Sequence, residues 1–173
     1  INKLIESLEL PREWQKDLKN YCDDKGIEFM STPFDEKAVD ELVHLGVKRL
    51  KISGFESTDL RFVEMVASTG LPIIISLGIG SSEKIHRIKS WIEKESPTTK
   101  MTFLHANHAY PTPFKDINLG ELKILKHWVS IHQYCNFGLS DHTKGILTPP
   151  IAVALGADVI EKHYTIDRTL PGP

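Results

Sequence analysis

The sequence predicts an α/β fold and, within that class, part of a TIM-type (β/α) barrel. Three observations lead to this prediction. Short apolar runs recur at intervals of roughly 25 to 30 residues, stretches with helical periodicity lie between them, and polar side chains follow nearly every run. The first two observations describe alternating strands and helices, and the third distinguishes a barrel from an open sheet.

Six short apolar segments are predicted to be buried strands. They are residues 27–30, 49–52, 72–76, 101–104, 137–139 and 159–160. The stretches between them have helical spacing, as in residues 36–45, where Val39, Leu42 and Val43 fall on one face. This alternation predicts parallel strands joined by right-handed crossovers, which both an open doubly wound sheet and a closed barrel would contain.

The polar residues at the strand ends favour the barrel. The loops after parallel barrel strands share one rim, whereas an open sheet concentrates its site at a single switch point. A complete barrel has eight strands in about 250 residues, so we expect a partial barrel of about six βα units, strands 3 to 8, in one domain over residues 1–173. Residues 11–25 have a helical pattern that leads into the first predicted strand, so the two remaining units are expected to precede Ile1.

The composition excludes several classes of function. A formal net charge of −2 offers no basic surface for nucleic acid and no polybasic stretch for an anionic membrane. No apolar run approaches the roughly 20 residues that span a bilayer. Cys22 and Cys135 lack the spacing of a zinc site or a disulfide framework. We therefore expect a protein of the reducing cytoplasm that binds neither nucleic acid nor membrane.

Two histidines are candidate metal ligands. His142 and His163 each follow a predicted strand on the same rim, and neutral imidazoles on adjacent strands can converge on one ion. Each lies near an acidic residue, Asp141 or Glu161, that could orient the ring. The alternative is that each histidine simply forms hydrogen bonds within its loop, and the pattern alone leaves both interpretations open.

A second group of residues could hold an anion. Ammonium and hydroxyl groups at neighbouring strand ends can match the oxygens of a phosphate or carboxylate. The candidates are Lys51, Ser53, Ser76, Ser140 and Lys162. The alternative is that the serines satisfy turns and the lysines extend into water, although a lysine inside a strand, as Lys51 is, fits that alternative poorly. The sequence has no GxGxxG, GxxxxGK[ST], HExxH or GxSxG motif. It therefore lacks the motifs typical of the common nucleotide-binding proteins and hydrolases.

Several short motifs, in order along nearly the whole chain, together resemble one family. They are STPFD from residue 31, KISG from 51, YPTP from 110, GLSDHT from 138, AVALGA from 152 and IEKHYT from 160. The sequence with these motifs is similar to the N-acetylneuraminate (sialic acid) synthases, a family that includes the legionaminic and pseudaminic acid synthases.

The resemblance implies a metal-dependent enzyme that condenses phosphoenolpyruvate with an N-acetylated hexose, such as N-acetylmannosamine, to a nonulosonic acid and phosphate. The implied metal is Mn²⁺, with Mg²⁺ or Co²⁺ as alternatives, held by His142 and His163. The implied catalytic residues are Lys51, Tyr110 and Glu161. The implied substrate-binding residues are Lys51, Ser53, Ser76, Asn107, His108, Tyr110 and Ser140.

The chain departs from the family pattern at two places that bear on this set. The phosphate-binding serine of the family is displaced by one position, so that Ser53 stands before Gly54. In the loop expected to face the sugar, Ala106 and Asn107 replace a usual Cys-Thr pair, and His108 replaces a usual serine or asparagine. Both departures lie where phosphate and sugar are expected to bind.

The resemblance also implies features outside the chain. A glutamate and a lysine from two preceding βα units would join the site, and a C-terminal antifreeze-like domain would link a homodimer. Two other functions remain as alternatives. One is a non-catalytic paralogue that acts as a binding or assembly module, which the sequence before Ile1 would distinguish. The other is a metal-dependent barrel hydrolase, disfavoured because no His-x-His is present.

Overall fold

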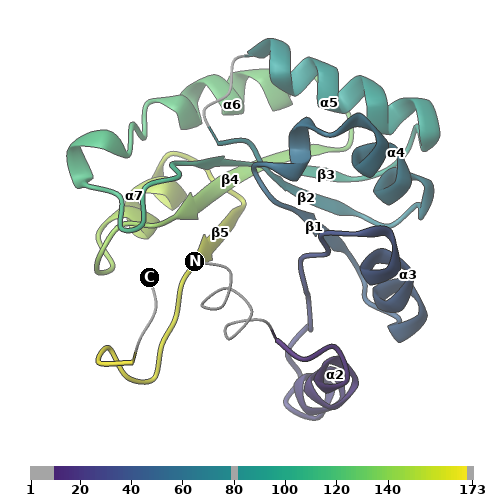
Figure 1. Cartoon of the computed structure of the whole chain (residues 1–173). Coiled ribbons are helices and arrows are strands. Elements are labelled where there is room, and N and C mark those ends of the chain that lie inside the picture. The colour runs from purple at the N-terminus through teal and green to yellow at the C-terminus, as the bar shows by residue number, and fades with distance from the viewer. Residues whose placement is uncertain (1–9, 79–81, 171–173) are drawn as a thin grey trace.

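The computed structural model describes residues 10–78 and 82–170, and it contains one curved parallel sheet flanked by helices (Figure 1). The strands follow one another across the sheet in chain order. They are β1 (Leu50–Ile52), β2 (Ile73–Ser76), β3 (Met101–Ala106), β4 (Cys135–Asp141) and β5 (Val159–Lys162). This architecture confirms the predicted α/β class and the partial barrel.

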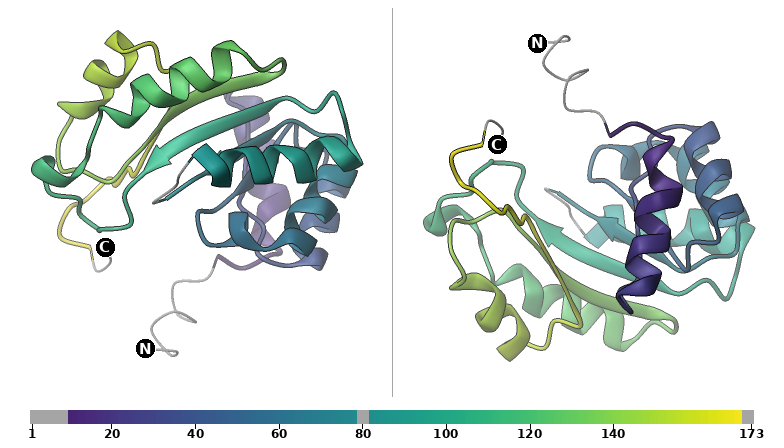
Figure 2. Two further views of the ribbon diagram at one scale, coloured as in Figure 1. Left: turned by 90° about the horizontal axis from the view of Figure 1, so that it is seen from above. Right: turned by 90° about the horizontal axis from the view of Figure 1, so that it is seen from below.

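The helices between the strands lie mainly on one side of the sheet, where α4, α5 and α6 cover its convex face (Figures 1 and 2). The α-helices are α2 (Trp14–Asp24), α3 (Glu36–Leu45), α4 (Leu60–Ser68), α5 (Ser82–Glu95), α6 (Glu121–Ser130) and α7 (Thr148–Ala154), with 3₁₀ turns at Glu56–Thr58 and Phe114–Asp116. None of the helices in the described part of the chain is long and apolar enough to cross a membrane.

Local capping explains where two of these helices begin. The Asp35 carboxylate accepts a hydrogen bond from the backbone N–H of Ala38 at the start of α3, and the Asp59 carboxylate accepts from Arg61 and Phe62 at the start of α4. Helix α3 ends at Gly46, whose φ of 77° is the left-handed conformation that favours glycine.

The prediction of a strand at residues 27–30 was wrong. The backbone of this segment forms no ladder with β1, and Ile27 is 62% exposed. A side-chain pair joins it to the residue before β1 instead: Arg49 Nε donates to Glu28 Oε1 at 2.5 Å. Apolar composition alone does not make a strand, since a strand is defined by the hydrogen bonds of a neighbour. The sheet of the described residues therefore has five strands and not six.

Strands β3 and β4 extend further than the apolar runs that predicted them. The ladder between them continues through Ala106 paired with Ser140, and the next ladder ends with Asp141 paired with Lys162. Several polar residues that we expected in loops therefore belong to strands. Their side chains must alternate between the two faces of the sheet.

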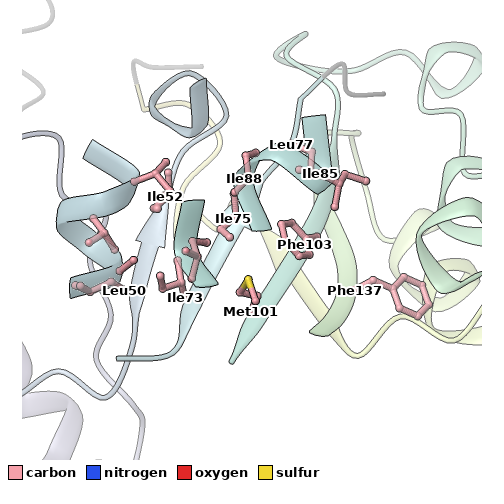
Figure 3. Close-up of a cluster of buried hydrophobic side chains, with 14 of the residues drawn as sticks. Leu50, Ile52, Ile73, Ile75, Leu77, Ile85, Ile88, Met101, Phe103 and Phe137 are labelled. Atoms are coloured by element: carbon pink, nitrogen blue, oxygen red, sulfur yellow. The ribbon is translucent and has the colours of Figure 1, made fainter. Parts of the chain in front are cut away.

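One face of the sheet carries the hydrophobic core. At one level of the register Ile75 lies beside Phe103, and Phe103 lies beside Phe137, and all three are buried against the helices (Figure 3). Strand residues in this core include Leu50, Ile52, Ile73, Ile75, Met101, Phe103, Phe137 and Leu139, and helix residues include Val63, Val66, Ile85, Ile88, Ile92, Leu122, Leu125 and Trp128. Complete burial of each large side chain contributes about 1.5–3 kcal/mol, so this face accounts for much of the stability.

The opposite, concave face alternates with the core and carries Lys51, Ser76, Ser140 and Glu161. Between these polar residues the two strands β4 and β5 approach closely at Gly138. A Cβ atom there would lie 2.0 Å from the carbonyl oxygen of Val159 and 2.8 Å from Leu104 Cδ2. Only glycine allows this approach, and Leu104 fills the space beside it.

The loop after β3 packs against the segments that follow β1 and β2. The His108 ring lies between Gly54 and Gly78, where a Cβ on either glycine would come within 2.5 Å of an imidazole atom. The Phe55 ring adds a contact at a centroid distance of 4.8 Å. The missing side chains at two strand exits therefore create the space that His108 occupies.

This packing predicts that substitutions at Gly54 and His108 have coupled effects on the stability of the protein. Gly54→Ser should destabilise the protein by about 1–3 kcal/mol, because the new Cβ overlaps the imidazole, and His108→Ala should relieve most of that loss. Urea denaturation of the two single variants and the double variant measures the coupling. Gly120→Ser is the control, since the nearest atom to a Cβ there is 3.4 Å away. Additive effects of the two substitutions would contradict the packing.

Candidate active site

Lys51 connects the two edges of the sheet. Its side chain points from β1 into the concave face, where Nζ donates to Ser76 Oγ at 2.9 Å and lies 3.3 Å from Glu161 Oε2. Glu161 belongs to β5, the opposite edge strand, so this contact requires the sheet to curl. Lys51 is 5% exposed, and a buried ammonium is tolerated only when charged and polar partners surround it.

Ser140 extends this cluster onto β4. Its hydroxyl donates to Glu161 Oε1 at 2.6 Å and is itself buried. The Glu161 carboxylate therefore binds the ammonium of Lys51 with one oxygen and the hydroxyl of Ser140 with the other. One cation, one carboxylate and two hydroxyl groups, from four different strands, converge on the concave face at the carboxyl ends of the sheet, where parallel barrels place their chemistry.

His142 lies beside this cluster in a defined tautomer. Its Nδ1 lies 2.5 Å from the carbonyl oxygen of Asn107. Because a carbonyl only accepts, Nδ1 carries a proton, and Nε2 lies 3.3 Å from Ser140 Oγ. Burial lowers the pKa of His142 below its ordinary value, and the neighbouring His163 lowers it further, against the opposing effect of the Asn107 carbonyl. The ring is therefore held neutral at pH 7.

Tyr110 and His163 complete an aromatic group around His142. The Tyr110 ring lies 4.0 Å from the His142 ring and 5.6 Å from the His163 ring, and the two imidazoles are 5.4 Å apart, all between centroids. Burial raises the pKa of the Tyr110 phenol, and the negative charge of Glu161 raises it further. The phenol therefore remains protonated at neutral pH and can donate a hydrogen bond.

The two histidines fit the role of metal ligands as a pair. They follow the ends of adjacent strands on the same face, and the hydrogen bond from Nδ1 to the Asn107 carbonyl turns His142 Nε2 toward Ser140 Oγ, 3.3 Å away, as the outer hydrogen bond of a ligating histidine orients its ring in metal sites. Within residues 10–78 and 82–170, no group of three or more His, Cys, Asp and Glu side chains is placed to hold an ion. The residues present thus fit two protein ligands with the other positions open to water and substrate.

Asp141 and Lys162 do not play the parts that their positions suggested. We expected the acidic neighbour to orient the His142 ring and Lys162 to join an anion site. Both side chains point instead to the other face of the sheet, where Lys162 Nζ binds Asp141 Oδ2 at 2.6 Å. Burial alone would raise the pKa of Asp141, but hydrogen bonds from Lys162, Thr148 and Thr143 outweigh it and lower the pKa. The backbone carbonyl of Asn107 orients His142.

The remaining predicted residues lie in the surrounding loops. Ser53 donates its hydroxyl to Glu56. The Asn107 amide donates to the carbonyl of Asp116 at 3.0 Å and accepts from the N–H of Ala109 at 2.8 Å, so both of its polar atoms are used within its own loop. The structure therefore unites Lys51, Ser76, Ser140 and Glu161 in one cluster. It unites Tyr110, His142 and His163 in another, and the 3.3 Å contact between Ser140 Oγ and His142 Nε2 joins the two clusters.

Two features of the site were absent from the sequence-based prediction. The carbonyl of Asn107 orients His142, and a backbone carbonyl leaves no signal in the residue type. A second hydrogen bond, from the N–H of Thr112 to the carbonyl oxygen of His142 at 2.8 Å, ties the loop after β3 to the end of β4. This loop therefore both orients His142 and carries Tyr110 over it.

Comparison with known proteins identifies relatives of the chain. It is 39% identical over 174 residues to N,N′-diacetyllegionaminic acid synthase of Legionella pneumophila, a match that covers 99% of this chain and 48% of that one. The crystal structure of the N-acetylneuraminic acid (sialic acid) synthetase of Leptospira borgpetersenii, in complex with citrate, aligns with a TM-score of 0.87 and 35% identity, over 96% of this chain and 56% of that one. The chain spans about half the length of the curated relatives it matches.

A more distant structure and a family model complete the comparison. A truncated 3-deoxy-D-arabino-heptulosonate 7-phosphate synthase of Thermotoga maritima aligns with a TM-score of 0.70 at 14% identity, over 87% of this chain and 58% of that one, which supports the barrel fold alone. The model of the NeuB family matches residues 1–173. With the match over the whole sequence and the close structural alignment, the chain belongs to the NeuB family of synthases.

Proposed function

We propose that this chain forms part of the active site of an enzyme that condenses phosphoenolpyruvate with an N-acetylated hexose to give a nonulosonic acid and inorganic phosphate. The observation that carries the proposal is the buried Lys51, held between Ser76 and Glu161 on the concave face. Membership of the NeuB family and the names of the related synthases support the same reaction class.

Phosphoenolpyruvate is the substrate that the first cluster suits. Lys51 supplies a positive charge, and Ser76 and Ser140 supply hydroxyl donors that can match carboxylate or phosphate oxygens. In the structure Glu161 forms an ion pair with Lys51 and accepts a hydrogen bond from Ser140. An incoming anion would exchange with Glu161 as the partner of Lys51, and this exchange would free the carboxylate of Glu161 to accept a proton.

The reaction has two bond-forming steps in this proposal. C3 of phosphoenolpyruvate attacks the aldehyde carbon of the open-chain sugar, and the aldehyde oxygen takes up one proton to become a hydroxyl. Water then adds at C2, and one of its protons passes to Glu161, which replaces the proton taken up by the aldehyde oxygen. The other proton leaves with the phosphate when the C2–O bond breaks, and a keto acid remains. Tyr110, protonated and beside both histidines, would donate a hydrogen bond to the sugar.

A divalent metal, Mn²⁺ or alternatively Mg²⁺ or Co²⁺, belongs to the proposal as well, with His142 and His163 as its protein ligands. When bound, it would supply a Lewis acid that polarises the aldehyde oxygen. The neutral state of His142 is the form that ligates metals. The homodimer and the cytoplasmic location expected from the sequence stay predictions.

Lys51→Met in the complete gene product should raise the KM for phosphoenolpyruvate about 10- to 100-fold, the effect of losing about 1.5–3 kcal/mol of charged hydrogen bonding. Phosphate release with a panel of N-acetylated hexoses measures this change, and circular dichroism verifies folding. Lys48→Met is the matched control, because Lys48 is exposed just before β1. An unchanged KM would remove Lys51 from the anion site.

His142→Ala should abolish metal-dependent phosphate release and leave the fold intact, because the ring faces the concave side and not the core. Titration of the apoenzyme with Mn²⁺ measures how phosphate release depends on the metal. His127→Ala, at an exposed position on α6, is the control. Full activity of the His142 variant at stoichiometric manganese would contradict the metal site. A folded wild-type protein that releases no phosphate with any hexose would favour the alternative of a binding or assembly module.

A further inference from the structure

The two histidine-bearing strand ends are joined on their far side by an ion pair. Asp141 immediately precedes His142, and Lys162 immediately precedes His163. The two residues are register partners in the β4–β5 ladder, and Lys162 Nζ lies 2.6 Å from Asp141 Oδ2. Lys162 Nζ also donates to the carbonyl oxygen of Thr143 at 2.8 Å, on the other side of His142.

Both oxygens of the Asp141 carboxylate accept hydrogen bonds, and the side chain is buried. Its Oδ1 accepts from the N–H of Thr143 at 2.9 Å, and its Oδ2 accepts from the hydroxyl of Thr148 at 2.6 Å as well as from Lys162. Its exposed fraction is 0%. Thr148 is the first residue of α7. The pair therefore links β4, β5 and the start of α7.

The pleat of the sheet makes this link relevant to the histidines. Successive side chains of a strand point to opposite faces, so a fixed direction at 141 and 162 fixes the opposite direction at 142 and 163. Lys162 holds the backbone on both sides of His142, through the side chain of Asp141 and the carbonyl of Thr143. The distance between the two imidazoles depends on the same pairing.

We propose that Asp141 and Lys162 are positioning residues that hold His142 and His163 in the relative placement required to share one ion. The inference rests on the proposed function in one respect, the metal. A buried ion pair is weak evidence for a purely stabilising role, because replacing both partners by uncharged groups is often neutral for stability. A positional role predicts instead that such a replacement alters the relative placement of the two imidazoles more than it lowers the stability of the fold.

The test uses the complete gene product with the double substitution Asp141→Asn and Lys162→Met, which leaves no unpaired charge. Asn retains an acceptor for the N–H of Thr143, and Met retains most of the length of the lysine. We expect the affinity for Mn²⁺, measured by electron paramagnetic resonance, to fall about 10- to 100-fold, the usual effect of losing a group that orients metal ligands. The single variant Lys162→Arg, which keeps the positive charge, should retain much of the Mn²⁺ affinity. Lys144→Met, at an exposed site in the next loop, should leave the affinity unchanged.

A second readout requires no metal. The Tyr110 ring, 4.0 Å from His142 between centroids, shifts the C–H resonances of that imidazole in the NMR spectrum of the apoprotein. In the double variant these shifts should move toward the values of a free histidine, with the melting temperature largely retained. Unchanged resonances and unchanged Mn²⁺ affinity would overturn the proposal, whatever the melting temperature. Moved resonances with a wild-type protein that binds no Mn²⁺ would uphold the positioning and refute the metal site.

Discussion

The alternation of side chains along parallel strands is the constraint on which this structure depends. Residues at one parity, such as Ile75, Phe103 and Phe137, form the core against the helices, and residues at the other parity, such as Lys51 and Ser140, form the candidate site. A slip of one residue in any ladder would exchange the two faces, placing an ammonium in the core and isoleucine in the site. Burial of the core therefore fixes the register, and the register in turn aligns the polar residues.

The sequence predicted the features that follow from local composition. Strands β1 to β5 each contain a short apolar run, and Lys51 within such a run could be recognised as unusual because a buried charge needs partners. The concentration of polar residues at the carboxyl ends of the strands predicted the barrel. Residues 27–30 show the limit of this reasoning, since they have the composition of a strand but no hydrogen-bonded neighbour among the described residues.

The partners of individual side chains could not be predicted, because they depend on where each strand ends. Lys162 was expected beside the anion site, yet β5 continues through residue 162, so its parity turns the side chain to the far face. In the same way, a backbone carbonyl orients His142 where an acidic neighbour had been expected. Neither outcome is encoded in residue type, since both arise when segments distant in the sequence meet in the folded chain.

Gly138 limits how the concave face of this sheet can change. The carbonyl oxygen of Val159 occupies the place of its missing side chain, so any larger residue would push β5 away and carry Glu161 and His163 with it. The floor of the concave face is thus closed to gradual remodelling by point mutation. Changes in the shape of the site would therefore fall on the loops above it, where the segment from Asn107 to Tyr110 contacts the strands through the Asn107 carbonyl and the His108 ring.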